Sequence, residues 1–309
     1  YNETCAQIGN FMWNWRMLLI SGDAKYADIM ELNIYNSIIS GIGLNGACWF
    51  YTNPLRWYGK DHVLLSNDLY ERSQPGEPPK RGQICCPSNL VRTVAGLHGY
   101  AYSISEEGIW VNLYGGNTFD GRLHDGSELK LTQETDYPWE GRVRITLEAA
   151  PPGPFSIMLR VPGWAKGATV QVNGKTLDMD VKPGSYATVN RSWKAGDVIA
   201  LHMPMKIRLI EAHPRVEQCR NHVAIMRGPI VFCVESPDLP ENVKVSQVRM
   251  PRNIELKAQR DKDLLGGVTV LVGEALMVEE GEWKGALHRE MSTEPLEKIN
   301  ITLIPYYAW

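Results

Sequence analysis

The spacing of apolar residues changes near residue 104, and this change favours a fold with separate helical and β regions. Before this point apolar side chains recur every three or four residues, as they do along one face of a helix. After it, short alternating segments are separated by Gly, Pro and Asn about every ten residues, which is typical of β-sandwiches. We therefore expect helices over residues 1–104, one β-sandwich over 105–203 and a second over 204–309.

The charge balance argues against two classes of partner. The 309 residues include 32 Lys and Arg and 35 Asp and Glu, which leaves a formal charge of −3. Proteins that bind nucleic acid or anionic membrane surfaces are usually strongly basic. No apolar run approaches the roughly 20 residues that cross a bilayer. We expect neither nucleic acid nor a membrane as a partner.

Two helices are predicted at the start of the chain. The first has the pattern of a capping box, with Thr4 as the N-cap residue and Gln7 three residues later, and it ends at Gly22. Asp23 can cap the second helix, which continues to Gly41. The apolar stripe predicted for the first helix consists of Ile8, Phe11, Met12, Trp15, Leu18 and Leu19. The stripe predicted for the second consists of Ile29, Leu32, Tyr35, Ile38 and Ile39.

Beyond residue 104, several apolar segments are predicted to be β-strands. In the first β block they are 109–114, 143–147, 157–161 and 169–172, and in the second they include 224–226 and 229–234. Asn173-Gly174, directly after the fourth segment, is a strong signal for a type I′ hairpin turn.

The cysteines are the candidate chemical groups. Six cysteines are too few for a disulfide scaffold of this length, and Cys85 and Cys86 are adjacent. A third helix is predicted after Cys86, with Pro87 at its first position, and Cys5 is predicted at the first position of the first helix. Because a helix N-terminus stabilises negative charge, we expect a lowered pKa for both Cys5 and Cys86.

Glu3 can join these thiols in a metal site. If the residue before the first helix is extended, the side chains of Glu3 and Cys5 can reach a common point. Together with Cys85 and Cys86 they would offer three sulfurs and one carboxylate, which is enough for a tetrahedral zinc ion. The spacing alone leaves a second interpretation open, because free cysteines are also common as small apolar core residues. Cys48, Cys219 and Cys233 are interpreted as core residues of this kind.

A set of motifs distributed along the chain resembles glycoside hydrolase family 127, the β-L-arabinofuranosidase family. The motifs are Tyr1-Asn2-Glu3-Thr4-Cys5-Ala6-Gln7-Ile8-Gly9, Tyr35-Asn36, Ser40-Gly41, Phe50-Tyr51-Thr52-Asn53-Pro54-Leu55, Cys85-Cys86-Pro87-Ser88-Asn89 with Arg92, Leu159-Arg160-Val161-Pro162-Gly163-Trp164, Val172-Asn173-Gly174 and Arg227-Gly228-Pro229-Ile230-Val231. The resemblance covers essentially the whole chain.

The resemblance implies that residues 1–104 are the last helices of a catalytic (α/α)6 barrel and that two β-sandwich domains follow. It implies a Zn²⁺ ion bound by Glu3, Cys5, Cys85 and Cys86, with Cys85 as the nucleophile of a retaining mechanism. It also implies that the general acid/base Glu precedes Tyr1. On this basis we expect the sequence to be the C-terminal half of a protein roughly twice as long, and we expect this half alone to be inactive.

Several expectations about ligands follow from the resemblance. The substrate would be an oligosaccharide or glycopeptide carrying a terminal β-L-arabinofuranose or a related five-carbon sugar. Gln83, Trp49 and Tyr51 are candidate substrate-binding residues because of their position and type. Two alternatives stay open: Gln83 caps the turn before Cys85, and Trp49 and Tyr51 belong to an aromatic-rich core. Glu71 and Glu77 are interpreted as solvated loop carboxylates. The sequence leaves open a homodimer formed through the β domains, and leaves open whether the compartment is the cytoplasm or periplasm of a glycan-degrading bacterium.

Two other interpretations make different predictions. In the first, the β region is a carbohydrate-binding or accessory module and the zinc site is purely structural, which predicts a closed site with inert thiols. In the second, the vicinal thiols sense redox conditions, which predicts a reversible Cys85–Cys86 disulfide and little bound zinc.

Overall fold

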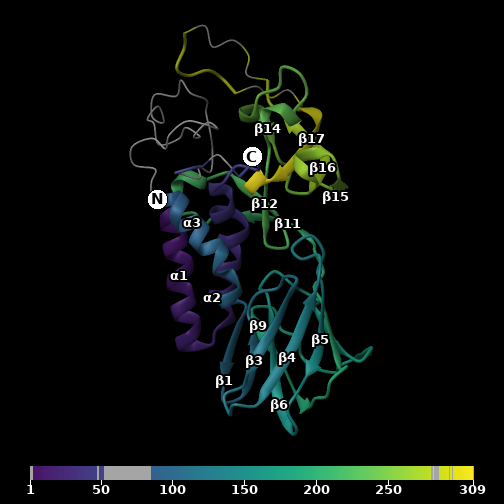
Figure 1. Ribbon diagram of the computed structural model, residues 1–309. Helices are drawn as coiled ribbons and strands as arrows, with labels where there is room; N and C mark the ends of the chain where they lie inside the picture. Colours follow the sequence, from purple (N-terminus) through teal and green to yellow (C-terminus); the bar gives the residue numbers. More distant parts are fainter. Residues whose placement is uncertain are drawn as a thin grey trace. The chain divides into compact units, whose positions relative to one another are not determined.

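The computed structural model describes residues 3–46, 49–51, 85–279, 281, 285–291, 293 and 295–308. The chain forms two compact units. The first contains Tyr1–Lys206 with Gly228–Ile230, and the second contains Ile207–Arg227 with Val231–Trp309. As the sequence predicts, helices come first along the chain and sheets follow (Figure 1).

The helices of the first unit are α1 (Thr4–Ser21), α2 (Ala24–Leu32) and α3 (Cys85–Ala95). The predicted boundary between the first two is confirmed. Gly22 adopts the left-handed conformation that ends α1, with φ 66°, and its N–H donates to Leu18 O. The Asp23 carboxylate then accepts a hydrogen bond from the Lys25 N–H and caps α2. A glycine at the helix end and a capping aspartate thus set this turn locally.

The predicted capping box at the start of α1 is wrong. The helix begins at Thr4, its N-cap residue is Glu3, and no side chain caps it. The Thr4 hydroxyl donates instead to Phe50 O at 3.0 Å, a residue 46 positions away. Because this partner satisfies the buried hydroxyl, Thr4 enters the helix and does not cap it.

The second predicted helix is interrupted. After α2 the chain continues as a π-helical turn, Asn33–Ile38, and a 3-10 turn, Ile39–Gly41. Within α2 itself, Ile29 and Leu32 of the predicted stripe lie on the exposed side, whereas Met30 of α2 and Ile34 of the π-helical turn are buried. The core of the helical region contains Ile8, Phe11, Leu18, Ala27, Met30, Ile34, Ile38 and Leu90.

The first β region contains two sheets. The four-stranded sheet has the order β1 (Tyr102–Ser105), β2 (Gly108–Val111), β6 (Pro154–Val161) and β9 (Ser185–Ser192). The six-stranded sheet has the order β3 (Asn117–Arg122), β4 (Glu128–Glu134), β5 (Arg142–Ala149), β10 (Val198–His202), β7 (Thr169–Val172) and β8 (Lys175–Thr176). The predicted Asn173-Gly174 turn joins β7 to β8, and both residues have positive φ, 51° and 78°.

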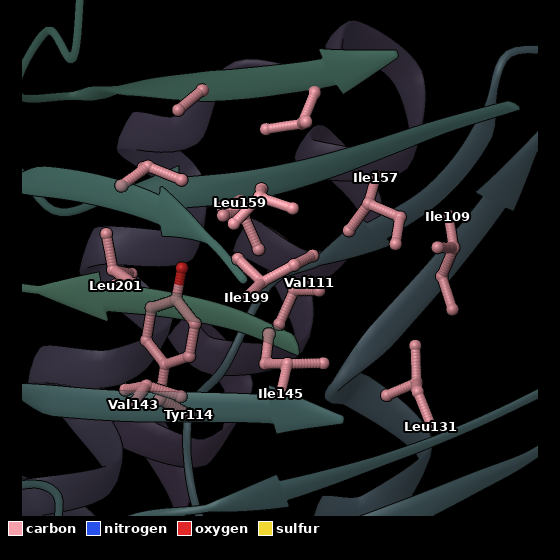
Figure 2. Packing of buried hydrophobic residues seen from close by; sticks show 14 of the residues in the cluster. Ile109, Val111, Tyr114, Leu131, Val143, Ile145, Ile157, Leu159, Ile199 and Leu201 are labelled. Carbon is pink, nitrogen blue, oxygen red and sulfur yellow. The ribbon is translucent and has the colours of Figure 1, made fainter. Parts of the chain in front are cut away.

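Apolar residues from the two sheets form one core. Figure 2 shows Ile109, Val111, Ile157 and Leu159 from the four-stranded sheet meeting Leu131, Val143, Ile145, Ile199 and Leu201 from the six-stranded sheet. The sheets therefore pack face to face, as in a sandwich. Strand β6 is buried on both faces. Its alternate residues, including Met158 and Arg160, point away from this core, and Arg160 reaches the carboxylates of α2.

The second unit contains one seven-stranded sheet. Its order is β11 (Ile207–Glu211), β12 (Val223–Arg227), β13 (Ile230–Cys233), β17 (Glu297–Pro305), β16 (Val268–Met277) and β14 (Val248–Arg249), and β15 (Leu256–Asp261) also pairs with β16. The sequence predicts two stacked sheets here, whereas the described residues form one continuous sheet. The reason is β17, which pairs with β13 at its last residues and with β16 along the rest of its length.

No helix within the described ranges combines the length and the apolar character needed to cross a membrane.

Candidate metal centre

The start of α1 is fixed by bonds to a segment far along the chain. The Thr4 N–H donates to Tyr51 O at 2.8 Å, next to the hydroxyl bond to Phe50 O. Glu3 precedes the helix in an extended conformation, with ψ 139°, and its carbonyl accepts the Gln7 N–H. This change from extended to helical backbone brings the Glu3 side chain near Cys5.

The two adjacent cysteines open α3. This helix begins at Cys85, two residues before the predicted first position at Pro87, so Cys86 lies inside the helix and Pro87 is its third residue. Proline is tolerated there because the first N–H groups of a helix have no intrahelical partner. Leu90 of α3 shares the helical core with Ile8 and Phe11 of α1. This packing brings the first turns of α1 and α3 together.

One carboxylate and three thiols meet at this junction. Ligand atoms of Glu3, Cys5, Cys85 and Cys86 all lie within 4.8 Å of one another. Cys86 Sγ lies 3.3 Å from Cys5 Sγ and 3.9 Å from Cys85 Sγ. Glu3 Oε1 lies 3.7 Å from each of the Cys85 and Cys86 sulfurs. Cys86 is buried, Cys5 and Glu3 are half-buried, and Cys85 is exposed.

The protein groups by themselves disfavour the charged form of the vicinal thiols. Burial raises the pKa of the Cys85 thiol, and the contact with Cys5 raises it further. Burial also raises the pKa of the Cys86 thiol, again with a contribution from Cys5. The predicted lowering of the Cys86 pKa is therefore wrong for the protein groups alone, because several acidic groups share one partly buried volume.

The four side chains fit a divalent cation of the zinc type. Three sulfurs and a carboxylate are ligand types that zinc prefers. Ligands about 2.3 Å from an ion at tetrahedral angles lie roughly 3.8 Å apart, close to the separations in this cluster. A bound cation would also offset the repulsion between several thiolates and a neighbouring carboxylate. For this reason a thiol that coordinates a metal loses its proton.

Asn89 is a member of this cluster that the sequence interpretation did not select. Its Nδ2 lies 3.2 Å from Cys5 Sγ, and its Oδ1 accepts a hydrogen bond from Arg92 Nη2 at 2.6 Å. Helical spacing is the sequence signal for Asn89, because Asn89 follows Cys86 by three residues and Cys85 by four. Residues at these intervals share one face of a helix.

Trp49 and Tyr51 are the candidate substrate-binding residues that lie within the described part of the chain. Trp49 and Tyr51 are half-buried and follow the turn that closes with the Ile42–Trp49 bridge. Trp49 packs against the helical core. Gln83, Glu71 and Glu77 lie outside the described residues, as does Cys48. Cys219 and Cys233 are half-buried in the second unit and lie outside the cluster.

Three family models together match nearly the whole chain. The β-L-arabinofuranosidase GH127 catalytic domain matches residues 1–99, the GH127 middle domain matches 108–205, and the glycoside hydrolase family 127 C-terminal domain matches 207–309. The chain belongs to glycoside hydrolase family 127. The catalytic-domain match contains all four residues of the cluster.

Named relatives agree with the GH127 assignment. A curated non-reducing end β-L-arabinofuranosidase of Bifidobacterium longum subsp. longum is 31% identical over 100% of the chain and 47% of its own length. A solved structure named glycoside hydrolase is 43% identical with a TM-score of 0.87, over 100% of this chain and 50% of that one. The GH127 β-L-arabinofuranosidase Ara127N-Se from Geobacillus stearothermophilus T6 is 38% identical with a TM-score of 0.88, over 99% of this chain and 47% of that one. The chain thus spans about half the length of these relatives.

Proposed function

We propose that the protein to which this chain belongs is a retaining glycoside hydrolase whose nucleophile is the Cys85 thiolate. Its substrate is a plant-type glycan with a terminal β-L-arabinofuranose or a related five-carbon sugar. The observation that carries the proposal is that Cys85 holds the exposed sulfur in a cluster of three sulfurs and one carboxylate. Only an exposed sulfur can approach the anomeric carbon of a sugar.

In this proposal Glu3, Cys5, Cys85 and Cys86 hold zinc. Bound zinc supplies the positive charge that keeps these thiols ionised near neutral pH. Cys85 Sγ then attacks the anomeric carbon, forming a carbon–sulfur bond as the bond to the leaving-group oxygen breaks. The leaving oxygen must take a proton from a general acid, and the family resemblance assigns that role to a Glu preceding Tyr1.

The second half of the reaction restores the thiolate. Water loses a proton to the same Glu and attacks the anomeric carbon, and the carbon–sulfur bond breaks. Two displacements at one carbon give net retention of configuration, as in glycosidases with a carboxylate nucleophile. Trp49 and Tyr51, next to the start of α1, and Gln83, two residues before the nucleophile, are the proposed sugar contacts.

The proposal also concerns the domain organisation. We assign residues 1–104 to the last part of an (α/α)6 barrel, 105–203 to a middle β-sandwich domain and 204–309 to a C-terminal β domain. Exposed apolar residues on α1 and α3 support packing against further helices, since Trp13 is 68% exposed and Ile20 is 79% exposed. Val91 and Val94 on α3 are exposed as well.

The names of the relatives support the choice of sugar. Both the curated relative and Ara127N-Se are named β-L-arabinofuranosidases. Since this chain spans about half of each, the substrate assignment applies to the whole protein. The 309-residue chain by itself is expected to show no turnover, because the proposed acid/base is not among its residues.

The decisive experiment uses the full-length protein with 4-nitrophenyl β-L-arabinofuranoside. Cys85→Ala and Cys85→Ser are expected to lower kcat by at least ~10³-fold, because the other two sulfurs of the cluster, those of Cys5 and Cys86, are half-buried and buried. Cys219→Ala, which removes a half-buried thiol outside the cluster, is the matched control and is expected to keep full turnover. Undiminished turnover by Cys85→Ala would remove Cys85 as the nucleophile.

Two further measurements separate catalysis from a structural zinc site. NMR of the first-formed sugar is expected to show the β anomer, in agreement with retention. A haloacetamide derivative of the sugar is expected to alkylate Cys85 in the zinc-loaded wild-type protein. Zinc binding together with an unreactive Cys85 and no turnover would favour the purely structural site.

A further inference from the structure

Asn89 connects a positively charged group to one of the cluster sulfurs. Arg92 Nη2 donates to Asn89 Oδ1 at 2.6 Å, and Asn89 Nδ2 lies 3.2 Å from Cys5 Sγ. We propose that Asn89, oriented by Arg92, is a positioning residue that keeps Cys5 as a permanent metal ligand and leaves Cys85 as the sulfur that reacts. This inference rests on the proposed function, since it concerns the same metal site.

The orientation of the Asn89 amide follows from chemistry. An arginine side chain has only donors, so the group facing Arg92 must be the amide oxygen. The amide nitrogen then points toward Cys5, and because its hydrogens can only donate, the sulfur is the acceptor. Arg92 therefore not only adds a positive charge nearby but also selects the amide orientation in which Asn89 Nδ2 donates to Cys5 Sγ.

Helix geometry makes this arrangement possible. Asn89 lies one turn after the cysteine pair on α3, and Arg92 lies three residues further on. The main-chain carbonyl of Asn89 accepts a hydrogen bond from the Thr93 hydroxyl at 2.8 Å, a bond within the same helix. Since α3 is regular here, the cysteine pair, Asn89 and Arg92 follow one another along one side of it.

The hydrogen bond distinguishes the three sulfurs from one another. An N–H group that donates to a sulfur stabilises its negative charge and occupies a lone pair, which makes that sulfur a poorer nucleophile. Partners of this kind orient metal ligands and tune their donor strength. Cys5 receives the amide, Cys86 is buried, and Cys85 is exposed. The structure thus gives each sulfur a different environment, and Cys85 is the one left accessible.

The test compares substitutions of Asn89 and Arg92 in the full-length protein by zinc affinity. Asn89→Leu keeps a similar volume but removes both amide groups, and it is expected to raise the zinc Kd by ~10–100-fold in chelator competition. Arg92→Leu leaves the amide in place but frees its orientation, so a smaller rise is expected. Arg92 is exposed, so this second variant is expected to fold even if Asn89→Leu does not.

Asn190→Leu is the matched control. Asn190 lies on β9 and its Nδ2 donates to Ser156 Oγ at 2.8 Å, in the β region and away from α1 and α3. This variant removes an amide hydrogen bond of similar length and is expected to leave the zinc Kd unchanged. Equal changes in Asn190→Leu and Asn89→Leu would mean a general loss of stability and would overturn the inference.

A spectroscopic readout separates a positioning role from a structural one. In the cobalt(II)-substituted protein, loss of the N–H donor makes the Cys5 thiolate electron-richer, so the sulfur-to-cobalt charge-transfer band is expected to move to longer wavelength. Limited alkylation with iodoacetamide followed by peptide mapping is expected to modify Cys85 in the wild-type protein and both Cys85 and Cys5 in Asn89→Leu.

The outcomes are distinct. A wild-type protein that binds no zinc would overturn the proposed function together with this inference. A wild-type protein that binds zinc, with Asn89→Leu and Arg92→Leu matching it in zinc Kd, cobalt spectrum and alkylation pattern, would overturn this inference alone.

Discussion

Arg160 on β6 and Glu31 on α2 form a buried ion pair between the four-stranded sheet and the helices of the first unit. The Arg160 side chain is 0% exposed, and it also contacts Asp28 of α2 at 2.5 Å. Tyr137 Oη donates to Glu31 at 2.5 Å. The Arg160 guanidinium, placed between two carboxylates, holds α2, and through its packing α1, on the sheet.

Removing this arginine is expected to be severely destabilising. Arg160→Met leaves Glu31 buried without its cationic partner, and breaking a buried pair costs about 3–5 kcal/mol. Urea unfolding followed by tryptophan fluorescence measures the change. Adding Glu31→Leu to Arg160→Met is expected to recover part of the loss, because no buried charge then remains on Glu31. Arg122→Met, which breaks an exposed Arg–Glu pair at 2.7 Å, is the control and should cost about 1 kcal/mol or less. Equal losses for the two arginines would contradict the argument.

The approach of Gly41 to Thr4 predicts a second effect on stability. A Cβ atom at Gly41 would lie 2.8 Å from Thr4 Cγ2, so Gly41→Ala is expected to cost about 1–3 kcal/mol through overpacking. Thr4→Ser removes that methyl group and keeps the hydroxyl, so the double variant should recover part of the loss. Gly9→Ala is the control, since nothing lies within 4 Å of its added Cβ and alanine favours a helix. The prediction fails if urea unfolding shows the same change for both glycines.

Asp197 predicts a pH-dependent contribution to stability. The hydrogen bond from Asn173 lowers the pKa of this buried carboxyl, and the Lys194 N–H lowers it further. An unfolded aspartate has a pKa of about 3.9. A carboxyl whose pKa is lower in the folded state stabilises the protein at pH values above about 3.9, and this stabilisation is lost as the pH falls through the folded-state pKa.

Asp197→Asn is therefore expected to lower the free energy of unfolding by about 1.5–3 kcal/mol at pH 7, the range for hydrogen bonds to a charged group. The difference from wild type should shrink as the pH falls below about 4 and through the lowered pKa of the folded-state carboxyl. Asp178→Asn, an exposed loop substitution, should follow the wild-type pH profile. A loss that is the same at pH 3 and pH 7 would rule out the ionised carboxyl as its cause.

Metal removal is expected to lower the Tm. If the cluster binds zinc in the folded state only, free zinc at about a hundred times its Kd stabilises the protein by about 2.7 kcal/mol. Dialysis against a chelator should lower the Tm measured by calorimetry, and zinc should restore it while magnesium should not. Cys86→Ala should abolish the response to zinc and Cys219→Ala should preserve it. A Tm that is insensitive to chelator and zinc would contradict a zinc site here.

Much of the local structure could be predicted from the sequence. Gly22 and Asp23 defined the turn between α1 and α2, and Asn173-Gly174 defined a hairpin. These signals act through the backbone preferences of one or two residues, so neighbouring sequence is sufficient to read them. The motifs were also sufficient to identify the family, because they recur in order along the whole chain.

Other features depended on contacts between distant segments. The Thr4 hydroxyl donates to Phe50 O and does not cap the helix, and α2 packs with Ala27 and Met30 inward and with Ile29 and Leu32 exposed. The single sheet of the second unit depends on β17, whose two neighbours are separated in sequence by more than 30 residues. No local signal specifies which of several hydrogen-bonding or packing partners a residue will meet.

The sequence by itself determined which residue types are available for chemistry: a glutamate and a cysteine at the start of one helix, and a cysteine pair at the start of another. Only the tertiary structure decided that these four groups lie within 4.8 Å of one another, that Cys85 is exposed, and that Asn89 contacts Cys5. The physical reason is that α1 and α3, about 80 residues apart along the chain, are brought together by the apolar core that they share. The packing of this core then sets the positions of the polar side chains at the starts of the two helices.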